Sequence, residues 1–384
     1  MIAMERIEAI NRDRIRWCCA QYGIPTAALA SVAGIADATM ERFLSGEIGL
    51  TFAQLRKIAG AFGRGTLFFL EPGPVDEEQV YTPQFRTIAN ERPDISAKLK
   101  TIIQRAEEQR EVYLALTEDL DEEAPPHFSP PALPDKPAAA AQVVRKWLRL
   151  DAERSFNEYR TAVEDRDVLV FRSNGYAGKW QFPVDSLVLG LALSYEIFPV
   201  ILVRKRPAEA QQTFTLFHEL SHLLLFQSSS IDDEKDMFAA HGRERRANDL
   251  AGRILVPDKL LGLVDDAARP HDAWHYPAWV SAVKQMTGTS TEVVLRRLLD
   301  AGRLAQEDYQ AYRQWARGRP QRQDEGGSRV YRHREPRHIF GDQFVRTVLE
   351  AKNAQRITLA RAARYLDGLK LKDMRLLEQF YAHV

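Results

Sequence analysis

The stretch Phe214-Thr-Leu-Phe-His-Glu-Leu-Ser-His-Leu-Leu-Leu-Phe226 decides the fold of the second half of this chain. It contains neither proline nor glycine and is apolar around most of its circumference, which predicts a helix buried in a core. Residues four apart share one helix face, so His218 and His222 can hold a single metal ion. Buried polar groups require partners, and a metal ion provides them.

The polar residues of this helix form the pattern His-Glu-x-x-His, the signature of zinc metallopeptidases. A catalytic zinc ion takes three protein ligands and leaves a fourth position to water, whose pKa falls to about 7. His218 and His222 would supply two ligands, and Glu219 would take the proton from that water and pass it to the leaving amine. The alternative is two buried core histidines beside a capping glutamate.

The third ligand is expected in a second helix, which the apolar spacing predicts between Glu244 and Pro257. If this helix packs against the first, the Glu244 carboxylate reaches the metal. Asn248, one turn later, could orient a ligand or bond backbone beside the site. His241, one turn before Glu244, is the rival third ligand.

Together these segments resemble the ImmA/IrrE family of zinc metallopeptidases. The pattern His-Glu-Leu-Ser-His is followed by Glu-x-x-Ala-Asn and by an apolar stretch that ends in Val-Pro, where the family typically has Met-Pro. The resemblance covers most of residues 80–315. It implies that His218, His222 and Glu244 bind Zn²⁺ and that Glu219 is the catalytic base. It also implies helix-turn-helix repressors as the substrate class, because family members of known role cleave them.

Two apolar segments upstream look like strands of this family. Residues 188–194 resemble its edge strand, and residues 199–203 resemble the strand that precedes the active-site helix. An extended peptide can add to an edge strand by backbone hydrogen bonds and present its scissile carbonyl to the metal. Gly190 would permit close approach of such a peptide, and an ordinary covered strand is the alternative.

Residues 1–72 predict an all-α domain. Residues 24–46 indicate a short helix, a turn at Gly34 and a second short helix, and Thr51 can cap a third helical segment. This arrangement is similar to the helix-turn-helix domain of XRE-type (Cro/repressor) DNA-binding proteins, whose recognition helix, here residues 37–45, enters the major groove of double-stranded DNA. The resemblance places DNA contacts at Thr26, Asp37, Ala38, Thr39 and Arg42.

The charges of this helix-turn-helix domain are a weak footprint for a DNA-binding protein. Residues 1–72 contain eight lysines and arginines against seven aspartates and glutamates, and the recognition segment carries Asp37 and Glu41. Carboxylates face phosphates poorly. Two hypotheses therefore stay open: the domain binds DNA, or it docks to another protein or forms a homodimer.

The rest of the chain divides by composition. Residues 73–141 predict a helical connector followed by a proline-rich linker. Residues 142–316 predict an ImmA/IrrE-like metallopeptidase domain, a zincin-like α+β fold with helices beside a small sheet whose strands are expected at residues 168–171, 187–195 and 200–203. The sequence of residues 317–384 predicts a basic linker followed by a helical region. The linker contacts nucleic acid or an acidic partner, or else it is solvated, and the helical region is expected to pack on the metallopeptidase domain or on a partner.

Bulk composition is that expected of a cytoplasmic protein. The 53 basic residues balance the 53 acidic ones, so nothing attracts the whole chain to nucleic acid or to a membrane. The sequence has no run of 18 apolar residues and no signal peptide. Cys18 and Cys19 are its two cysteines, and adjacent thiols make no metal site, so zinc must be held by histidine and carboxylate.

We therefore expect a zinc-dependent endopeptidase that cleaves a repressor or antitoxin-like partner and is coupled to a helix-turn-helix domain. The alternative is a DNA-binding regulator or antitoxin in which the same fold is a zinc-stabilised sensor or interaction module without proteolysis. A third hypothesis keeps the zinc site and gives the enzyme a different hydrolytic substrate.

Overall fold

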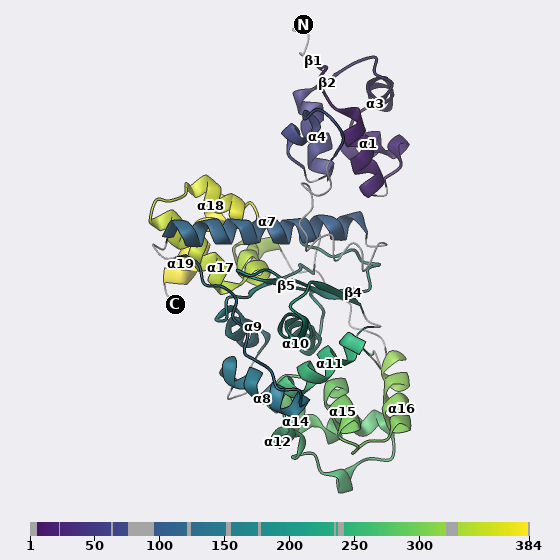
Figure 1. Ribbon diagram of the computed structural model, residues 1–384. Helices are drawn as coiled ribbons and strands as arrows, with labels where there is room; N and C mark the ends of the chain where they lie inside the picture. Colours follow the sequence, from purple (N-terminus) through teal and green to yellow (C-terminus); the bar gives the residue numbers. More distant parts are fainter. Residues whose placement is uncertain are drawn as a thin grey trace. The chain divides into compact units, whose positions relative to one another are not determined.

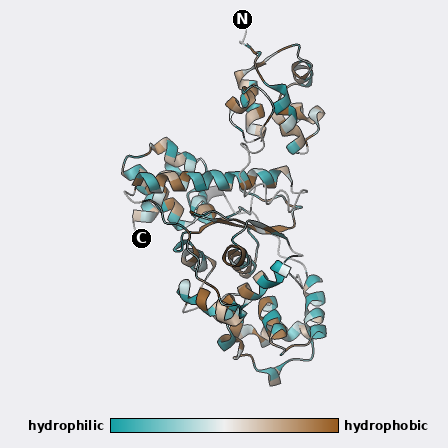
Figure 2. Ribbon diagram, in the orientation of Figure 1, coloured by the Kyte–Doolittle hydropathy of each residue, from teal (hydrophilic) through white to brown (hydrophobic). Residues whose placement is uncertain are grey.

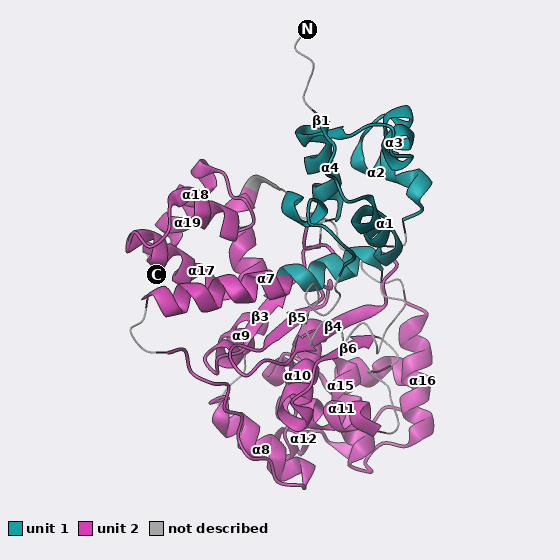
Figure 3. Ribbon diagram, turned by 45° about the horizontal axis from the view of Figure 1, so that its top comes forward, with its two compact units in different colours: residues 1–105 teal, residues 106–384 magenta. Residues whose placement is uncertain are grey.

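The computed structural model describes residues 6–22, 24–62, 64–75, 96–120, 124–150, 155–175, 178–233, 236, 242–319 and 329–382, and Figure 1 labels their helices and strands. The chain forms two compact units, residues 1–105 and residues 106–384, which Figure 3 shows in two colours. Helix α7 (Ala97–Leu120) begins in the first unit and ends in the second.

The first unit consists of short helices around one core. Its two short strands, β1 and β2, pair in antiparallel fashion. In chain order its elements before α7 are β1 (Arg6–Ile7), α1 (Arg12–Gln21), η1 (Thr26–Ala28), α2 (Leu29–Ala33), α3 (Asp37–Leu44), β2 (Leu50–Thr51), α4 (Phe52–Phe62) and η2 (Thr66–Phe69).

The turns of the first unit have the residues that their conformations need. Gly34 ends α2 at φ 60°, in the left-handed region that glycine adopts without a steric penalty. The Thr51 hydroxyl accepts a hydrogen bond from the backbone N–H of Gln54 at 3.2 Å and so caps α4. Phe43 of α3 and Phe62 of α4 are completely buried in the shared core. Helices α2, α3 and α4 thus lie where the sequence predicts them.

The second unit is built on a four-stranded sheet with the order β3-β5-β4-β6. Strands β3 (Leu169–Arg172) and β5 (Val200–Val203) run parallel, whereas β4 (Val188–Leu193) is antiparallel to both β5 and β6 (Ser230–Asp233). The three predicted strands are present. Valine, leucine and isoleucine dominate β5 and β4, as expected of strands buried on both faces.

Helix α10 (Glu209–Phe226) packs on one face of this sheet, against β4 and β5. Ile201 and Val203, which alternate along β5, belong to the same buried core as Leu216 and Leu220 of α10. Figure 2 shows the strands and this helix as the most apolar part of the unit. Helices α9 (Phe156–Glu164) and α11 (Gly242–Leu255) pack against α10, and α8 (Pro137–Trp147) packs against α11.

The other face of the sheet is covered by α17 (Glu335–Asn353), near the end of the chain. Phe171 of β3 contacts Phe340 and Phe344 of α17 edge-on, with ring centroids 5.8 and 6.0 Å apart. Tyr113 of α7 stacks on Phe344 at 5.8 Å. Burial of these aromatic rings holds α17 to the sheet. Of the two predicted arrangements, packing on a partner or back on the chain, the C-terminal region thus adopts the second and packs on the sheet of the second unit.

The remaining described elements complete the second unit. None of the helices in the described ranges is both long and apolar enough to cross a membrane. In chain order the elements are α12 (Asp258–Leu261), η4 (Asp266–Ala268), η5 (Ala273–His275), α13 (Tyr276–Trp279), α14 (Ser281–Thr287), α15 (Thr291–Asp300), α16 (Gln306–Arg317), η6 (Arg329–Arg334), α18 (Leu359–Tyr365) and α19 (Leu371–Ala382).

The expectation that residues 188–194 form an edge strand is wrong. Strand β4 lies inside the sheet, because β6 pairs with it from Val188 opposite Asp233 to Ala192 opposite Ser230. Backbone pairing with β6 uses the hydrogen-bonding groups that a docking peptide would need. In the sheet as described, β6 is the outer strand next to α10.

Candidate metal centre

Three elements bring four potential metal ligands together. His218 and His222 project from α10, Glu244 from the first turn of α11, and Asp232 from β6. Helices α10 and α11 pack closely against each other, and α10 also packs on β4. Because β6 is the neighbour of β4 in the sheet, Asp232 comes to lie over the same side of α10 as the two histidines.

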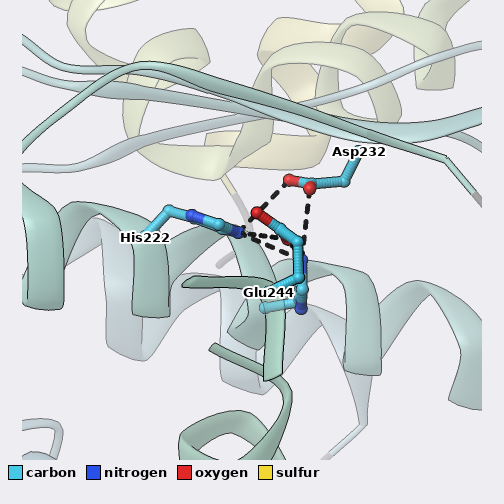
Figure 4. Close-up of side chains that lie close together, drawn as sticks. His222, Asp232 and Glu244 are labelled. Atoms are coloured by element: carbon cyan, nitrogen blue, oxygen red, sulfur yellow. Dashed lines mark hydrogen bonds and ion pairs between the residues drawn. The ribbon is translucent and has the colours of Figure 1, made fainter. Parts of the chain in front are cut away.

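Nitrogen and oxygen atoms of these four residues converge on one point. The Nε2 atoms of His218 and His222 are 3.2 Å apart, and Glu244 Oε2 lies 3.4 and 3.1 Å from them, respectively. Asp232 Oδ1 lies 3.5 Å from His218 Nε2, and Asp232 Oδ2 lies 3.5 Å from His222 Nε2. Figure 4 shows the side chains of His222, Asp232 and Glu244 directed toward one another.

These separations match those of ligand atoms around one divalent metal ion. Atoms bound to a tetrahedral zinc ion at about 2.0–2.1 Å are about 3.3 Å apart. One ligand atom from each of the four residues lies within 4.8 Å of the others. Asp232 Oδ2 is buried and has no hydrogen-bond partner within the described part of the chain. Two imidazoles and two carboxylates, one of which has a buried oxygen without a hydrogen-bond partner in the described ranges, fit a metal ion.

Glu219 lies beside this cluster on α10. It is completely buried, its Oε2 accepts a hydrogen bond from Ser230 Oγ at 3.3 Å, and its Oε1 has no hydrogen-bond partner in the described ranges. A Cβ atom added to Gly190 of β4 would stand 2.5 Å from Glu219 Oε1. The glycine predicted to admit a peptide therefore makes room for the Glu219 side chain.

The charges around the cluster favour a cation between the carboxylates. Burial lowers the pKa of His218, but hydrogen bonds with Asp232 and Glu244 outweigh that effect and raise it to about 9. Burial raises the pKa of Glu244, but hydrogen bonds with both histidines outweigh it and lower the pKa well below the ordinary range. Burial, together with the carboxylates of Asp232 and Glu244, raises the pKa of Glu219 well above its ordinary value.

Two further predictions concern residues around α11. Asn248 is partly buried, and its Nδ2 donates to the backbone carbonyl of Asp236 at 2.9 Å, so it bonds the backbone of the segment that follows β6. That is one of the two roles predicted for it. His241, the rival third ligand, lies outside the described residues.

Asp232 is a potential ligand that the sequence pattern did not predict. It belongs to a four-residue strand that contains two aspartates, which gives no apolar strand signal. The signal that could have revealed it is the two-residue period of β6, because Ser230 and Asp232 both face α10 and contact Glu219 and the histidines, respectively. That period carries weight only once the pairing of β6 with β4 is known.

The five residues predicted to contact DNA lie in the first unit. Thr26 is in η1, and the other four are in the first two turns of α3. Thr26, Asp37, Ala38 and Arg42 are exposed, and Thr39 is partly buried. Arg42 Nε forms an ion pair with Glu47 Oε2 at 3.1 Å, which partly satisfies the one cation of the set. DNA binding by these residues stays a prediction.

Part of the second unit matches a known protein family. Residues 165–299 match the model of the peptidase M78 family, described as an IrrE N-terminal-like domain. This range contains His218, Glu219, His222, Asp232 and Glu244. A search of curated proteins finds no match, and neither does a search of solved structures. The resemblance to the ImmA/IrrE family is thereby confirmed for this part of the chain.

Proposed function

We propose that this chain, which carries a domain of the ImmA/IrrE metallopeptidase family, is a zinc-dependent endopeptidase. The observation that carries the proposal is the convergence of His218, His222 and Glu244 on one point, with the buried carboxylate of Glu219 next to them. We propose zinc as the metal because imidazole and carboxylate are its usual ligands in hydrolytic sites.

The position of each side chain suggests its role in the proposed hydrolysis. When bound, zinc would lower the pKa of a water molecule and polarise the scissile carbonyl. Glu219 would take the proton of the attacking water on Oε1, the oxygen without a hydrogen-bond partner in the described ranges, and return it to the leaving amine. Ser230 would hold the other oxygen of Glu219 in place through its 3.3 Å hydrogen bond.

The proposed substrate is a transcriptional repressor or an antitoxin-like protein. Support comes from the family resemblance and from the position of β6, the outer strand of the sheet, which carries Asp232, one of the four potential metal ligands. An extended segment of the substrate would add to the outer edge of β6 through backbone hydrogen bonds. The first unit would bind DNA or the protein partner, and its Thr26, Asp37, Ala38, Thr39 and Arg42 are the proposed contacts.

Proteolysis is tested with the zinc-loaded protein and a library of peptides from a digested proteome. Mass spectrometry would identify new peptide ends, which are expected with the native protein and absent after chelation. The variant Glu219→Gln keeps the shape of the side chain and removes the base, so it should bind zinc normally and cleave at least about 100-fold more slowly. Equal cleavage by this variant would refute the role of Glu219.

A second candidate function is favoured by Asp232. Catalytic zinc sites leave one position to water, whereas structural sites are closed by four protein ligands. Asp232 lies as close to the histidines as a fourth ligand would, and it is only 2 % exposed. Under this second function the protein is a DNA-binding regulator or antitoxin, and the closed metal site stabilises a sensor or interaction module without proteolysis.

The variant Asp232→Ala separates the two functions, and cobalt substitution provides a readout that does not depend on activity. In a peptidase, His218, His222 and Glu244 would hold the metal and the position next to Asp232 would belong to water, so the variant should keep the metal, change its visible cobalt spectrum and cleave peptides at least as fast as the native protein. In a structural site, the variant should lose metal and stability together, with no cleavage in either form.

A further inference from the structure

A second polar site lies apart from the metal cluster, in a cavity of about 140 Å³ between α9, β3 and the start of α17. Four arginines line it, against two carboxylates. The arginines are Arg160, Arg172, Arg334 and Arg337, and the carboxylates are Glu164 and Asp342. Arg334 and Arg337 lie within residues 317–384, whose basic stretch is predicted either to contact nucleic acid or an acidic partner or to be solvated.

Each of the two carboxylates is paired with one arginine. Glu164 Oε1 accepts from Arg160 Nε at 2.8 Å, and Asp342 Oδ1 accepts from Arg337 Nε at 2.8 Å. Arg160 also donates to the backbone carbonyls of Arg337, His338 and Ile339. These pairs leave the positive charges of the other two arginines uncompensated within the cavity.

Arg172 is the more buried of these two, with 8 % of its surface exposed. Its Nη2 donates to His338 Nδ1 at 2.6 Å, and its Nη1 lies 3.5 Å from Gln212 Oε1. Its Nε is buried and has no hydrogen-bond partner in the described part of the chain. Among the described residues Arg172 forms no ion pair with a carboxylate, which is unfavourable for a buried guanidinium.

His338 supplies no negative charge to offset Arg172. Its Nε2 lies 3.1 Å from the carbonyl oxygen of Ser173 and donates to it, so Nδ1 is the acceptor of a neutral ring. Burial and the adjacent Arg172 lower the pKa of His338 to about 3. Burial and the nearby Arg160 lower the pKa of Arg172 to about 9, against the opposing effect of Glu209. Within the described ranges, Arg172 therefore has only neutral side chains as hydrogen-bond partners.

We propose that this cavity binds a small phosphate-type anion, either free inorganic phosphate or the phosphate group of a phosphomonoester. Arg172 would hold the anion at the buried end, where its Nε and Nη atoms present the planar donor pair that matches two oxygens of a phosphate. Arg334 is exposed and would close the other side.

The site also touches the helix that carries the metal cluster. Gln212, the residue beside Arg172, lies on α10 six positions before His218. The 3.5 Å contact between Arg172 and Gln212 is at the outer limit of a hydrogen bond, so an anion can replace it at little cost. Binding of the anion would thus change a contact at the beginning of the active-site helix.

Binding is tested by isothermal titration of the zinc-loaded full chain with inorganic phosphate and, separately, with adenosine monophosphate. We expect saturable binding of at least one of them with a Kd below about 1 mM. Tighter binding of phosphate identifies the free anion as the ligand, and tighter binding of the nucleotide identifies a phosphomonoester. Absence of saturable binding of both would overturn the proposal.

Variants assign the binding to this cavity and separate it from anion binding at the metal. Arg334→Gln changes an exposed residue and should fold normally, yet weaken binding about tenfold or more, because it removes one charge-assisted contact. Arg172→Gln should abolish binding. Arg361→Gln, which removes an exposed arginine of α18 outside the cavity, should change nothing. Binding that is equally strong in the native protein and in Arg334→Gln would refute the site.

Discussion

Gly190→Ala is the sharpest test of the geometry around Glu219. The added Cβ would stand 2.5 Å from both Glu219 Oε1 and Thr215 Cγ2, whereas ordinary contacts begin at 3.4 Å. Both neighbours belong to α10, which is packed between the sheet and α11. Either the Glu219 carboxylate or the strand must therefore move by about 0.9 Å.

Two magnitudes follow from this displacement. Overpacking of a well-filled core by one methyl group costs about 1–3 kcal/mol of stability. A catalytic group displaced by about 1 Å slows the reaction by about 100-fold. Zinc binding should change little, because the methyl group contacts Glu219, the proposed general base, rather than His218, His222 or Glu244. The variant should thus separate metal content, which it keeps, from turnover, which it loses.

The assay combines thermal unfolding, zinc content and peptide cleavage. Gly252→Ala is the matched control, because its Cβ would meet only the flexible Arg297 side chain, at 3.1 Å, in the same unit and away from the metal. It should lose some stability and no activity once folded. If Gly190→Ala cleaves peptides at the native rate, Glu219 is not held against β4 as described, and the reasoning fails.

Three further predictions concern His218, His338 and Gly341. His218→Ala should lower the zinc content of the purified protein to near background, measured by elemental analysis, while Ser221→Ala on the same helix should leave it unchanged. His338 has a folded pKa of about 3, below its ordinary 6.5, so it binds fewer protons than in the unfolded chain, and stability is lost as pH falls from 6.5 toward 3. Between pH 7 and pH 5 the native protein should therefore lose up to about 2 kcal/mol more than His338→Asn in urea unfolding, and equal losses would contradict a neutral buried ring. Gly341→Ala should unfold more easily than Gly368→Ala by about 1–3 kcal/mol, because both glycines have positive φ but only at Gly341 would a Cβ collide with Glu164.

Local sequence was sufficient for the parts of the site that lie on helices. The four-residue spacing of His218 and His222 sets them on one face of α10 in any context, because the helical period depends only on the backbone. The amphipathic pattern after residue 244 likewise predicted α11, whose Glu244 Oε2 lies 3.1 Å from His222 Nε2. Turn and cap residues such as Gly34 and Thr51 located the helices of the first unit for the same reason.

The tertiary structure alone decided which distant segments meet. Strand pairing depends on partners far along the chain. The sequence therefore did not reveal that β6 pairs with β4 and so brings Asp232 close to the histidines. The cavity around Arg172 likewise exists only because α17 packs on β3. The sequence pattern of α17 indicated a helix with an apolar face, but it did not indicate the element against which that face packs. Side-chain periods arise within a few residues of backbone, whereas contacts between separate elements arise from the packing of the whole core.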